Sequence, residues 1–475
     1  MVPSDVNSLV LTESCMLPLL RSRILSVALG SAVVLSLGCA EDAPTAPGHS
    51  TAPALDAAAV ATLAQEVRAL TAARGIGPLA RPAAVRPELV RLGQALAFDR
   101  ILSGNRDISC MSCHLPTFGT GDGRSLSIGQ GATGLGPARV HPGGEFIPRN
   151  APAAFNLAAV GPLFWDGRVV MDERGHFVTP AKQRVTPEMA RVFEFGALSA
   201  LPLFPVLSRE EMRAFTGNEL ARVSDKQAQQ VWRLLMDRLG RIQEYRRMFE
   251  AAYPGTRFAE MNFGHASNAI AGFLIDKLAF NDSPWDRFLA GDDAAMTDVQ
   301  LRGAKNFMSA RCSICHNGPA LTDNRFHNVA VAQFGPGKGD GASRRDDFGR
   351  EEVTGNPHDR YAFRTPPLRN VELTAPYGHD GAFFSLRDFV AHYSESDIKL
   401  RAFDVNGLEP ALRGTLLQNF EDILATRDTL LNGVVFPDEV IDEVTEFMKA
   451  LTDPAARDLN AVAPATVPSG LPVDK

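Results

Sequence analysis

Two short cysteine motifs constrain this chain of 475 residues more than any other feature. They are Cys-Met-Ser-Cys-His at 110–114 and Cys-Ser-Ile-Cys-His at 312–316. With the C-x-x-C-H spacing, two thiols can bond to the two vinyl groups on one edge of a haem, and the adjacent histidine can bind the iron. The two copies therefore predict two covalent c-type haems. The attachment residues are then Cys110, Cys113 and His114 in the first motif, and Cys312, Cys315 and His316 in the second.

Two other kinds of site also use closely spaced cysteines. A structural zinc ion needs four ligands in one cluster, and neither motif has a clear local partner pair of Cys or His. A thiol–disulfide exchange site needs no histidine directly after the second cysteine in both copies. The chain has six cysteines, and the remaining two are Cys15 and Cys39. Six are too few for a disulfide scaffold in a chain of this length. Four are assigned to the haems, Cys39 is a candidate lipid anchor and Cys15 is assigned to a discarded or untranslated leader, so we expect no disulfide in the mature protein.

Composition and charge narrow the class of protein further. The chain is 45% hydrophobic and 22% charged, which is ordinary for a globular protein and rules out a disordered or collagen-like chain. The net charge is −7, and no basic face stands out to bind phosphates. The sequence therefore predicts no nucleic-acid partner.

The N-terminal region resembles an export signal. Two arginines precede an apolar run at 24–38, and a run of about 15 residues is too short to span a membrane but suits a signal peptide. The run ends in Gly38-Cys39, which resembles a bacterial lipoprotein processing site; a plain secretory signal cut nearby is the alternative. We expect a signal peptide at 1–38, a flexible tether at 39–58, and a periplasmic protein that contacts the membrane only through a lipid anchor on Cys39, in the outer membrane.

The rest of the chain alternates between helices and long loops. Helical periodicity predicts helices at 57–73, 87–99, 226–252, 262–280, 297–309, 408–428 and 437–451. Long stretches rich in Gly and Pro, at 115–168 and 317–383, predict ordered loops, and loops of that length are usually functional. The fold class that follows is mainly α, with two cytochrome c-like helical domains that each enclose one haem. Their predicted bounds are 59–260 and 261–455, followed by a tail at 456–475.

Several segments besides the haem motifs resemble one known family, from about residue 87 to residue 451. They include Leu92-Gly93, Ser103-Gly104-Asn105, Ser127-Ile128-Gly129-Gln130-Gly131, Arg149-Asn150-Ala151-Pro152, Phe164-Trp165-Asp166-Gly167-Arg168, and the stretches 363–371 and 373–381. This set resembles the bacterial di-haem cytochrome c peroxidases and their MauG relatives, which oxidise a partner protein. The resemblance implies an exported oxidoreductase that reacts with hydrogen peroxide at an open first haem.

The resemblance also implies how electrons travel. Oxidising equivalents would pass through the second haem to an electron donor, either a small redox protein such as a cytochrome c or a cupredoxin, or a protein substrate. The chain would work alone or as a homodimer. The alternative from a different class is a non-catalytic di-haem electron carrier, in which both irons have two strong protein ligands.

The resemblance assigns roles around the first haem. In well-known members of the family, a histidine in the Ser-Ile-Gly-His-Gly loop caps this iron until reduction releases it, and Gln130 stands at that place here. The first haem is therefore expected to be open without reductive activation, unless His141 replaces the missing ligand. Glu211 is the expected acid–base group for peroxide, with Glu210 as the alternative. Leu201 replaces a glutamine that is common in the family, which leaves full peroxidase activity open.

Further roles follow for the second haem and for the region between the haems. Trp165 matches the tryptophan that relays electrons between the two haems, and a buried structural role is its alternative. Tyr393 stands where the MauG branch has the sixth iron ligand, and the adjacent His392 is the alternative ligand. His379 resembles a histidine near the second haem.

A calcium site between the domains is also implied by the resemblance. It would use the side-chain oxygen of Asn150 and the carbonyls of Thr374 and Pro376, with waters. The stretches 133–148 and 169–199 look like insertions, and the sequence does not assign them a role.

Overall fold

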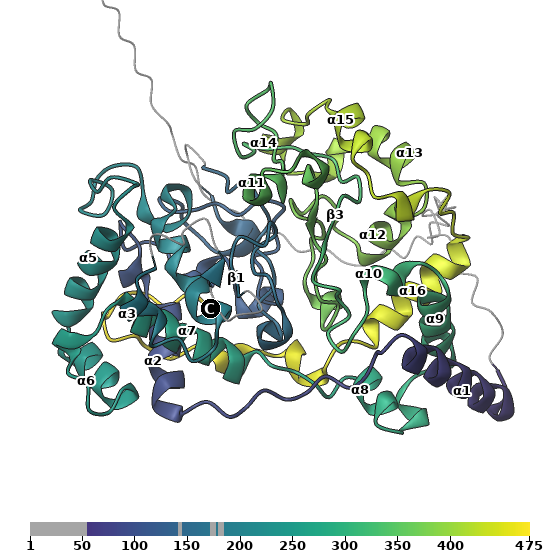
Figure 1. Cartoon of the computed structure of the whole chain (residues 1–475), viewed down its shortest axis with the longest axis horizontal. Coiled ribbons are helices and arrows are strands. Elements are labelled where there is room, and N and C mark those ends of the chain that lie inside the picture. The colour runs from purple at the N-terminus through teal and green to yellow at the C-terminus, as the bar shows by residue number, and fades with distance from the viewer. Residues whose placement is uncertain (1–54, 141–144, 172–176, 179–184) are drawn as a thin grey trace, which may run out of the picture. The chain divides into compact units, whose positions relative to one another are not determined.

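A computed structural model describes residues 55–140, 145–171, 177–178 and 185–475 of the chain (Figure 1). The predicted signal peptide, Cys15, Cys39 and most of the predicted tether lie outside the described residues. His141 and parts of both predicted insertions do as well.

The described chain is largely helical, which confirms the predicted fold class. The α-helices are α1 (Ala57–Ala73), α2 (Pro87–Phe98), α3 (Pro187–Ala190), α4 (Ala197–Ala200), α5 (Ala228–Gly240), α6 (Gln243–Ala252), α7 (Phe263–Lys277), α8 (Pro284–Leu289), α9 (Asp298–Ser309), α10 (Cys312–Cys315), α11 (Glu351–Thr354), α12 (Leu386–His392), α13 (Ser396–Arg401), α14 (Pro410–Arg413), α15 (Phe420–Ala425) and α16 (Asp438–Lys449). Two short antiparallel pairs accompany them: β1 (Val170–Met171) with β2 (Phe177–Val178), and β3 (Phe326–His327) with β4 (Phe363–Arg364).

Short helical turns fill much of the long loops. The 3₁₀ turns are Arg100–Leu102, Cys110–Ser112, Pro116–Phe118, Gly136–Ala138, Leu157–Ala159, Leu201–Leu203, Pro205–Leu207, Phe258–Glu260, Asp293–Ala295, Pro357–Asp359, Val371–Leu373, Val405–Gly407, Thr429–Leu431, Pro454–Arg457 and Asn460–Val462, and one π-helical turn spans Arg209–Arg213.

The first hydrophobic core forms where α2 crosses α7. Pro87 begins α2, where its missing N–H would have had no helical partner. Leu89 and Leu92 face the core and are fully buried. At the crossing, a β-carbon on Gly93 would lie 1.9 Å from the carbonyl oxygen of Ala269 in α7. Glycine therefore allows the two helix backbones to touch directly before the first haem motif.

The second core repeats this arrangement with α9 and α16. The hydroxyl of Thr297 caps α9 by accepting the third N–H of the helix. A β-carbon on Gly303 would lie 1.8 Å from the carbonyl oxygen of Glu443 in α16. Beside this contact, the rings of Phe307 and Phe447 are fully buried with centroids 5.2 Å apart. Each C-x-x-C-H motif thus follows a helix whose glycine lies at a close crossing.

The N-terminal helix packs in the second core, and the C-terminal segment packs in the first. Helix α1 packs against α9 (Figure 1, dark purple), and its Leu63 and Val67 are buried in the second core. After α16 the chain returns to the first core, where Ala456, Leu459 and Val467 are buried. Two segments that are distant in sequence therefore tie the cores together.

The core memberships also bear on the predicted bounds of the domains. The bound at 260/261 lies before α7, yet α7 packs against α2 in the first core. The first core extends to Leu278, and the second begins again at Trp285.

Two predicted helices differ from the structure. The stretch 226–252 forms α5 and α6 with a break after Gly240, where a side chain would lie 2.6 Å from the ring of Phe258. The predicted helix at 408–428 is wrong: only α14 and α15 form there. Between them the N–H of Leu417 donates to the carbonyl of Gln333, so a long-range bond replaces the helical one.

Candidate functional site

The first C-x-x-C-H motif forms a tight turn that frees one nitrogen of its histidine. The N–H groups of Cys113 and His114 both donate to the carbonyl of Cys110, at 3.3 and 3.2 Å. The Nδ1 of His114 lies 3.0 Å from the carbonyl oxygen of Thr120, and burial lowers the pKa of the imidazole. A neutral ring whose Nδ1 donates to a carbonyl leaves the Nε2 lone pair free for a metal.

The second motif has the same geometry on a single helical turn, α10. The N–H of His316 donates to the carbonyl of Cys312 at 2.9 Å, and its Nδ1 lies 3.1 Å from the carbonyl oxygen of Leu321. Burial lowers the pKa of His316 to about 4, so the ring is neutral near pH 7. The two predicted proximal histidines are therefore oriented alike, by carbonyls five or six residues further along the chain.

A cavity opens beside the second motif and fits a covalently bound haem. Its walls include Cys312, Cys315, His316, Trp165, Arg364 and Tyr393. Arg364 is 5% exposed and donates only to backbone carbonyls; among the described residues it has no carboxylate partner. Burial lowers the pKa of Arg364 to about 10, which shows the cost of a cation without a counter-charge. A haem carries two propionates that can supply this missing negative charge.

Of the two candidate sixth ligands of the second haem, only Tyr393 lines this cavity. Tyr393 lines the cavity, and burial raises the pKa of its hydroxyl, with a further upward effect from Cys315 and Cys312. The neighbouring His392 does not line the cavity, and its Nε2 lies 2.8 Å from the carbonyl oxygen of Val329.

Glu211 lies beside the first motif on the π-helical turn Arg209–Arg213. The hydroxyl of Ser208 accepts the N–H of Glu211 at 3.2 Å and begins the turn. Burial raises the pKa of the Glu211 carboxyl. Its negative charge in turn contributes to the raised pKa of the thiols of both Cys110 and Cys113, for which burial is the larger cause. Single π-helical turns are frequent at functional sites, because they redirect one side chain.

The loop that holds Gln130 packs directly against this turn. The N–H of Gln130 donates to the carbonyl of Glu211 at 3.0 Å. A β-carbon on Gly129 would lie 1.7 Å from the carbonyl oxygen of Glu210, so only glycine fits there. The side-chain oxygen of Gln130 accepts a hydrogen bond from Asn105 at 2.5 Å. The structure therefore brings Gln130 and Glu211 together at the first motif.

Trp165 is held at both of its polar ends. Its indole N–H donates to the carbonyl of Asn150 at 2.9 Å, and its own carbonyl accepts the N–H of Arg364 at 2.8 Å. The preceding residue, Phe164, has a positive φ of 65°, which is unusual for a residue with a side chain. Trp165 thus lies in the wall of the cavity beside the second motif, on a loop with a constrained backbone.

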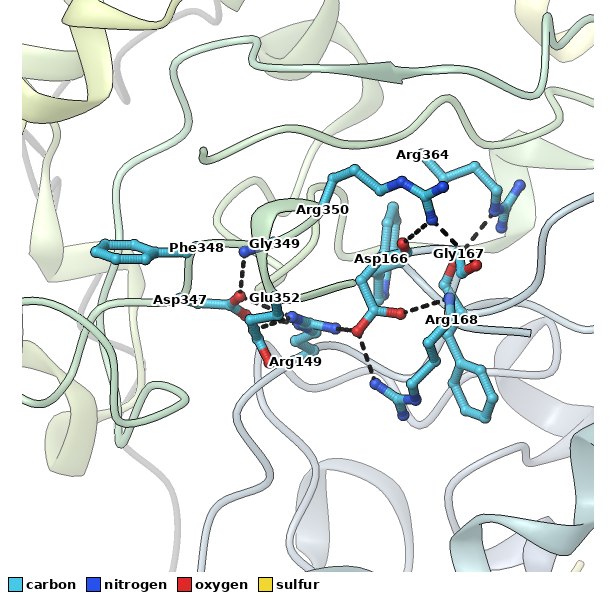
Figure 2. Close-up of polar contacts among 12 residues, drawn as sticks. Arg149, Asp166, Gly167, Arg168, Asp347, Phe348, Gly349, Arg350, Glu352 and Arg364 are labelled. Atoms are coloured by element: carbon cyan, nitrogen blue, oxygen red, sulfur yellow. Dashed lines mark hydrogen bonds and ion pairs between the residues drawn. The ribbon is translucent and has the colours of Figure 1, made fainter. Parts of the chain in front are cut away.

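A buried ion-pair network fixes this loop (Figure 2). Arg149 is 8% exposed and donates to Asp347 at 2.6 and 2.7 Å, to Asp166 at 2.5 Å and to Glu352 at 2.8 Å. Arg168 also donates to Asp166, at 2.9 Å. Because Asp166 follows Trp165 directly, the network joins the tryptophan loop to a segment 198 residues away from Arg149 in sequence.

The network changes the pKa values of its carboxyls. Burial alone would raise the pKa of Asp347 and Asp166, but Arg149 outweighs it and both are lowered. Burial and the charge of Asp347 raise the pKa of Glu352 to about 8, against the opposing charge of Arg149. Asp347 and Asp166 are therefore ionised at neutral pH.

The three candidate calcium ligands, Asn150, Thr374 and Pro376, are among the residues that line the cavity. The N–H of Asn150 donates to the carbonyl of His379 at 2.8 Å. Asp380, next in sequence, is 2% exposed, and neither of its carboxylate oxygens has a hydrogen-bond partner among the described residues. The sequence interpretation missed Asp380, although it lies in a segment that resembles the family.

The sequence interpretation also missed two carboxylates that contact His327, which lines the cavity beside the second motif. Its Nδ1 lies 2.5 Å from Asp428 and its Nε2 lies 3.0 Å from Asp323. Burial opposes the charged form, but the hydrogen bonds to these carboxylates and to Cys315 raise the pKa of His327 to about 11. Each ring nitrogen faces a carboxylate oxygen, and this arrangement favours the doubly protonated ring. Two carboxylates far apart in sequence gave no local signal for this arrangement.

No helix among the described residues is long and apolar enough to cross a membrane. Among the described residues, the structure shows no disulfide.

Comparisons with known proteins place these features in one family. A family model for di-haem cytochrome c peroxidases matches residues 87–294. Cytochrome c551 peroxidase of Pseudomonas aeruginosa is 32% identical over 302 residues, which cover 63% of this chain and 70% of that protein. The methylamine utilization protein MauG of Methylorubrum extorquens is 28% identical over 317 residues, which cover 66% of this chain and 70% of that protein.

Solved structures agree on the fold. A MauG-like protein associated with microbial copper homeostasis matches with a TM-score of 0.55 and 25% identity, over 81% of this chain and 94% of that one. The di-haem peroxidase BthA of Burkholderia thailandensis matches with a TM-score of 0.54 and 21% identity, over 84% of this chain and 98% of that one. The chain therefore belongs to the di-haem cytochrome c peroxidase and MauG family, and by that membership it is a peroxidase-type oxidoreductase with two c-type haems.

Proposed function

We propose that this protein is exported, reduces hydrogen peroxide at its first haem, and receives the electrons through its second haem. The observation that carries the proposal is the Glu211 carboxyl, which lies beside the first motif and has a raised pKa. A carboxyl in that position can accept a proton from one peroxide oxygen and donate it to the other.

The two motifs would hold the two haems. Cys110 and Cys113 would form the thioethers of the first haem, with His114 on its iron. The second haem would be held in the same way by the second motif, and Arg364 supports its placement as a counter-charge for a propionate. When bound, the first haem supplies the redox chemistry that splits the oxygen–oxygen bond of peroxide.

The residues around the first motif would transfer protons and leave the first haem accessible to peroxide. Reduction of one hydrogen peroxide to two waters consumes two electrons and two protons. Glu211 would hold and transfer one proton on its buried carboxyl. Gln130, pinned by Asn105 and by the Glu211 turn, puts a weak amide where related proteins have a histidine. This substitution supports a first haem that reacts without prior reduction.

Trp165 would conduct electrons between the haem sites. Its hydrogen bonds to Asn150 and Arg364 hold both ends of the residue. The Arg149 network also anchors the adjacent Asp166 (Figure 2). A relay needs a fixed position and orientation, and these contacts support that role for Trp165.

Tyr393 would be the sixth ligand of the second haem, because it lines the cavity that His392 does not. Replacing Tyr393 with Phe should change the ferric spectrum of the second haem and raise its midpoint potential, since an anionic oxygen ligand favours Fe(III). Spectra and a redox titration of the holoprotein would measure both. The matched control is His392→Gln, which should leave the spectrum unchanged. The opposite pattern would make His392 the ligand.

The remaining parts of the proposal rest on the sequence and on residues that line the cavity. A calcium ion would bind the side-chain oxygen of Asn150 and the carbonyls of Thr374 and Pro376, and the unpaired Asp380 supports a cation nearby.

The protein would be periplasmic, with Cys39 as a lipid anchor. Its reductant would be a small redox protein, or a residue of a partner protein that is oxidised in the reaction. Gln130 and Tyr393 favour the partner protein. The chain would act as a monomer or a homodimer.

The wild-type protein tests the proposal. Holoprotein with two haems per chain, shown by mass and haem quantification, should consume peroxide while it oxidises reduced cytochrome c, a cupredoxin or a partner protein. Two low-spin haems whose spectra do not change on addition of peroxide would instead indicate a non-catalytic electron carrier.

A further inference from the structure

The C-terminal segment returns from the second core to the first haem motif. After α16, residues 454–475 run along the first core, where Val462 and Val467 are buried. The carbonyl of Val462 accepts a hydrogen bond from Gln94 in α2 at 2.8 Å. The hydroxyl of Ser469 donates to the fully buried Asp99 at 2.6 Å. This segment is therefore tied to the first core along its length.

The segment brings a buried carboxylate, Asp474, to the first motif. Asp474 is 0% exposed. One of its oxygens accepts hydrogen bonds from the hydroxyls of Ser109, at 2.8 Å, and Ser112. The other accepts from Nε of Arg100 at 3.1 Å. Ser112 stands between the two cysteines of the motif, and its hydroxyl accepts the N–H of Ser109 at 2.8 Å. The carboxylate thus holds the turn that carries both thiols.

The second motif lacks this contact. The position that matches Ser112 is Ile314, which has no hydroxyl. The neighbouring Ser313 donates to the carbonyl of Met308 at 3.1 Å, which is a neutral acceptor. Among the described residues, a carboxylate therefore accepts a hydrogen bond from the residue between the two cysteines at the first motif and not at the second.

Two cations face Asp474 and reduce the effect of its charge. Arg100 forms an ion pair with it, and the charge of the buried Arg139 also interacts with it. Arg139 donates its hydrogen bonds to the carbonyls of Ile128, Gly134 and Gly129. Changes to Asp474 and to Arg100 should therefore act on the first haem site with opposite signs.

We propose that Asp474 is a positioning residue of the first haem site, which fixes the turn carrying Cys110 and Cys113 and lowers the reduction potential of the haem held there. The inference rests on the proposed haem attachment at that motif. A buried anion favours Fe(III), which carries one more positive charge than Fe(II), and the low dielectric of the interior strengthens the effect. The C-terminal segment, which follows the second core in sequence, thereby influences the reduction potential of the first haem.

A redox titration of the full two-haem protein tests the proposal. Asp474→Asn should shift the midpoint potential of the first haem upward and alter its ferric spectrum. Arg100→Gln should shift the same potential downward, because it leaves the Asp474 charge less compensated. The double variant should fall between the two. The second haem is the internal reference, and its potential should not move in any variant. Asp458→Asn, an exposed carboxyl of the same segment, is the matched control and should change neither potential.

The outcomes separate this inference from the proposed function. Unchanged first-haem potentials in Asp474→Asn and Arg100→Gln proteins that carry two haems would overturn the role of Asp474. Shifts of the same sign in both would also overturn it, since general disruption of the fold would then explain them. If Asp474→Asn does not assemble with two haems, the potential of the first haem in Arg100→Gln tests the role of Asp474: a downward shift supports it, and an upward shift or no shift overturns it. A wild-type protein with one haem, attached only at the second motif, would instead contradict the proposed haem attachment.

Discussion

Replacing Glu211 with glutamine should lower kcat/KM for hydrogen peroxide by about 10²- to 10⁴-fold, the usual contribution of a general acid–base group. Glutamine keeps the size of the side chain and the backbone bonds to Ser208 and Gln130, but it cannot accept a proton. The raised pKa of the Glu211 carboxyl brings it closer to neutral pH, where proton transfer in both directions is efficient. Stopped-flow mixing of the holoprotein with peroxide measures the rate directly.

Glu210→Gln is the matched control for this prediction. The two carboxyls are adjacent on the same π-helical turn, and Glu210 accepts a hydrogen bond from the hydroxyl of Ser208 at 3.1 Å. The control variant should retain most of the peroxide rate. A large loss in Glu210→Gln together with a small loss in Glu211→Gln would transfer the acid–base role to Glu210. Equal small losses would remove both residues from the chemistry.

Replacing Arg149 with methionine should destabilise the protein by about 3–5 kcal/mol, because it leaves buried carboxylates without their main counter-charge. Asp347 would lose both of its hydrogen bonds to the guanidinium, and Asp166 would keep only Arg168 (Figure 2). The transition should be followed by denaturant unfolding of the holoprotein. Arg91→Met is the control: its ion pair with Glu88 is largely exposed, so the change should cost less than about 1 kcal/mol.

The destabilisation by Arg149→Met should depend on pH. In the wild-type protein the pKa values of Asp347 and Asp166 are lowered, so their contribution to stability is present above their unfolded pKa and is lost as the pH falls through the folded pKa. Without Arg149, burial raises these pKa values, and protonation relieves the unpaired charges in mild acid. The difference in stability between variant and wild type should therefore be larger at pH 8 than at pH 5. A difference that is independent of pH would show that lost packing, not unpaired charge, causes the effect.

The helices next to the haem motifs could be predicted because their signals are local. The periodic leucines of α2 and the capping Thr297 of α9 act within a few residues, and both helices begin within a residue of their predicted start. The helix predicted at 408–428 failed because the backbone of Leu417 bonds to Gln333, which no local pattern reveals.

The candidate site divides in the same way. The proximal histidines follow from the chemistry of the C-x-x-C-H spacing, whereas Gln130, Glu211 and Tyr393 could be found only by resemblance to a family. The contact of Asp474 with Ser112 spans 362 residues of sequence. Neither residue has a pattern of its own, so only the folded chain brings this charge to the haem turn.

The reaction of the fully oxidised wild-type protein with hydrogen peroxide tests the central claim most directly. The protein is prepared with both haems ferric, and its spectrum is followed after mixing with peroxide in the absence of any reductant. In the proposed function Gln130 stands where related proteins have a capping histidine, so the spectrum should show a high-spin haem before mixing and should change rapidly on addition of one equivalent of peroxide. A protein with no high-spin haem that reacts with peroxide only after partial reduction would contradict the account.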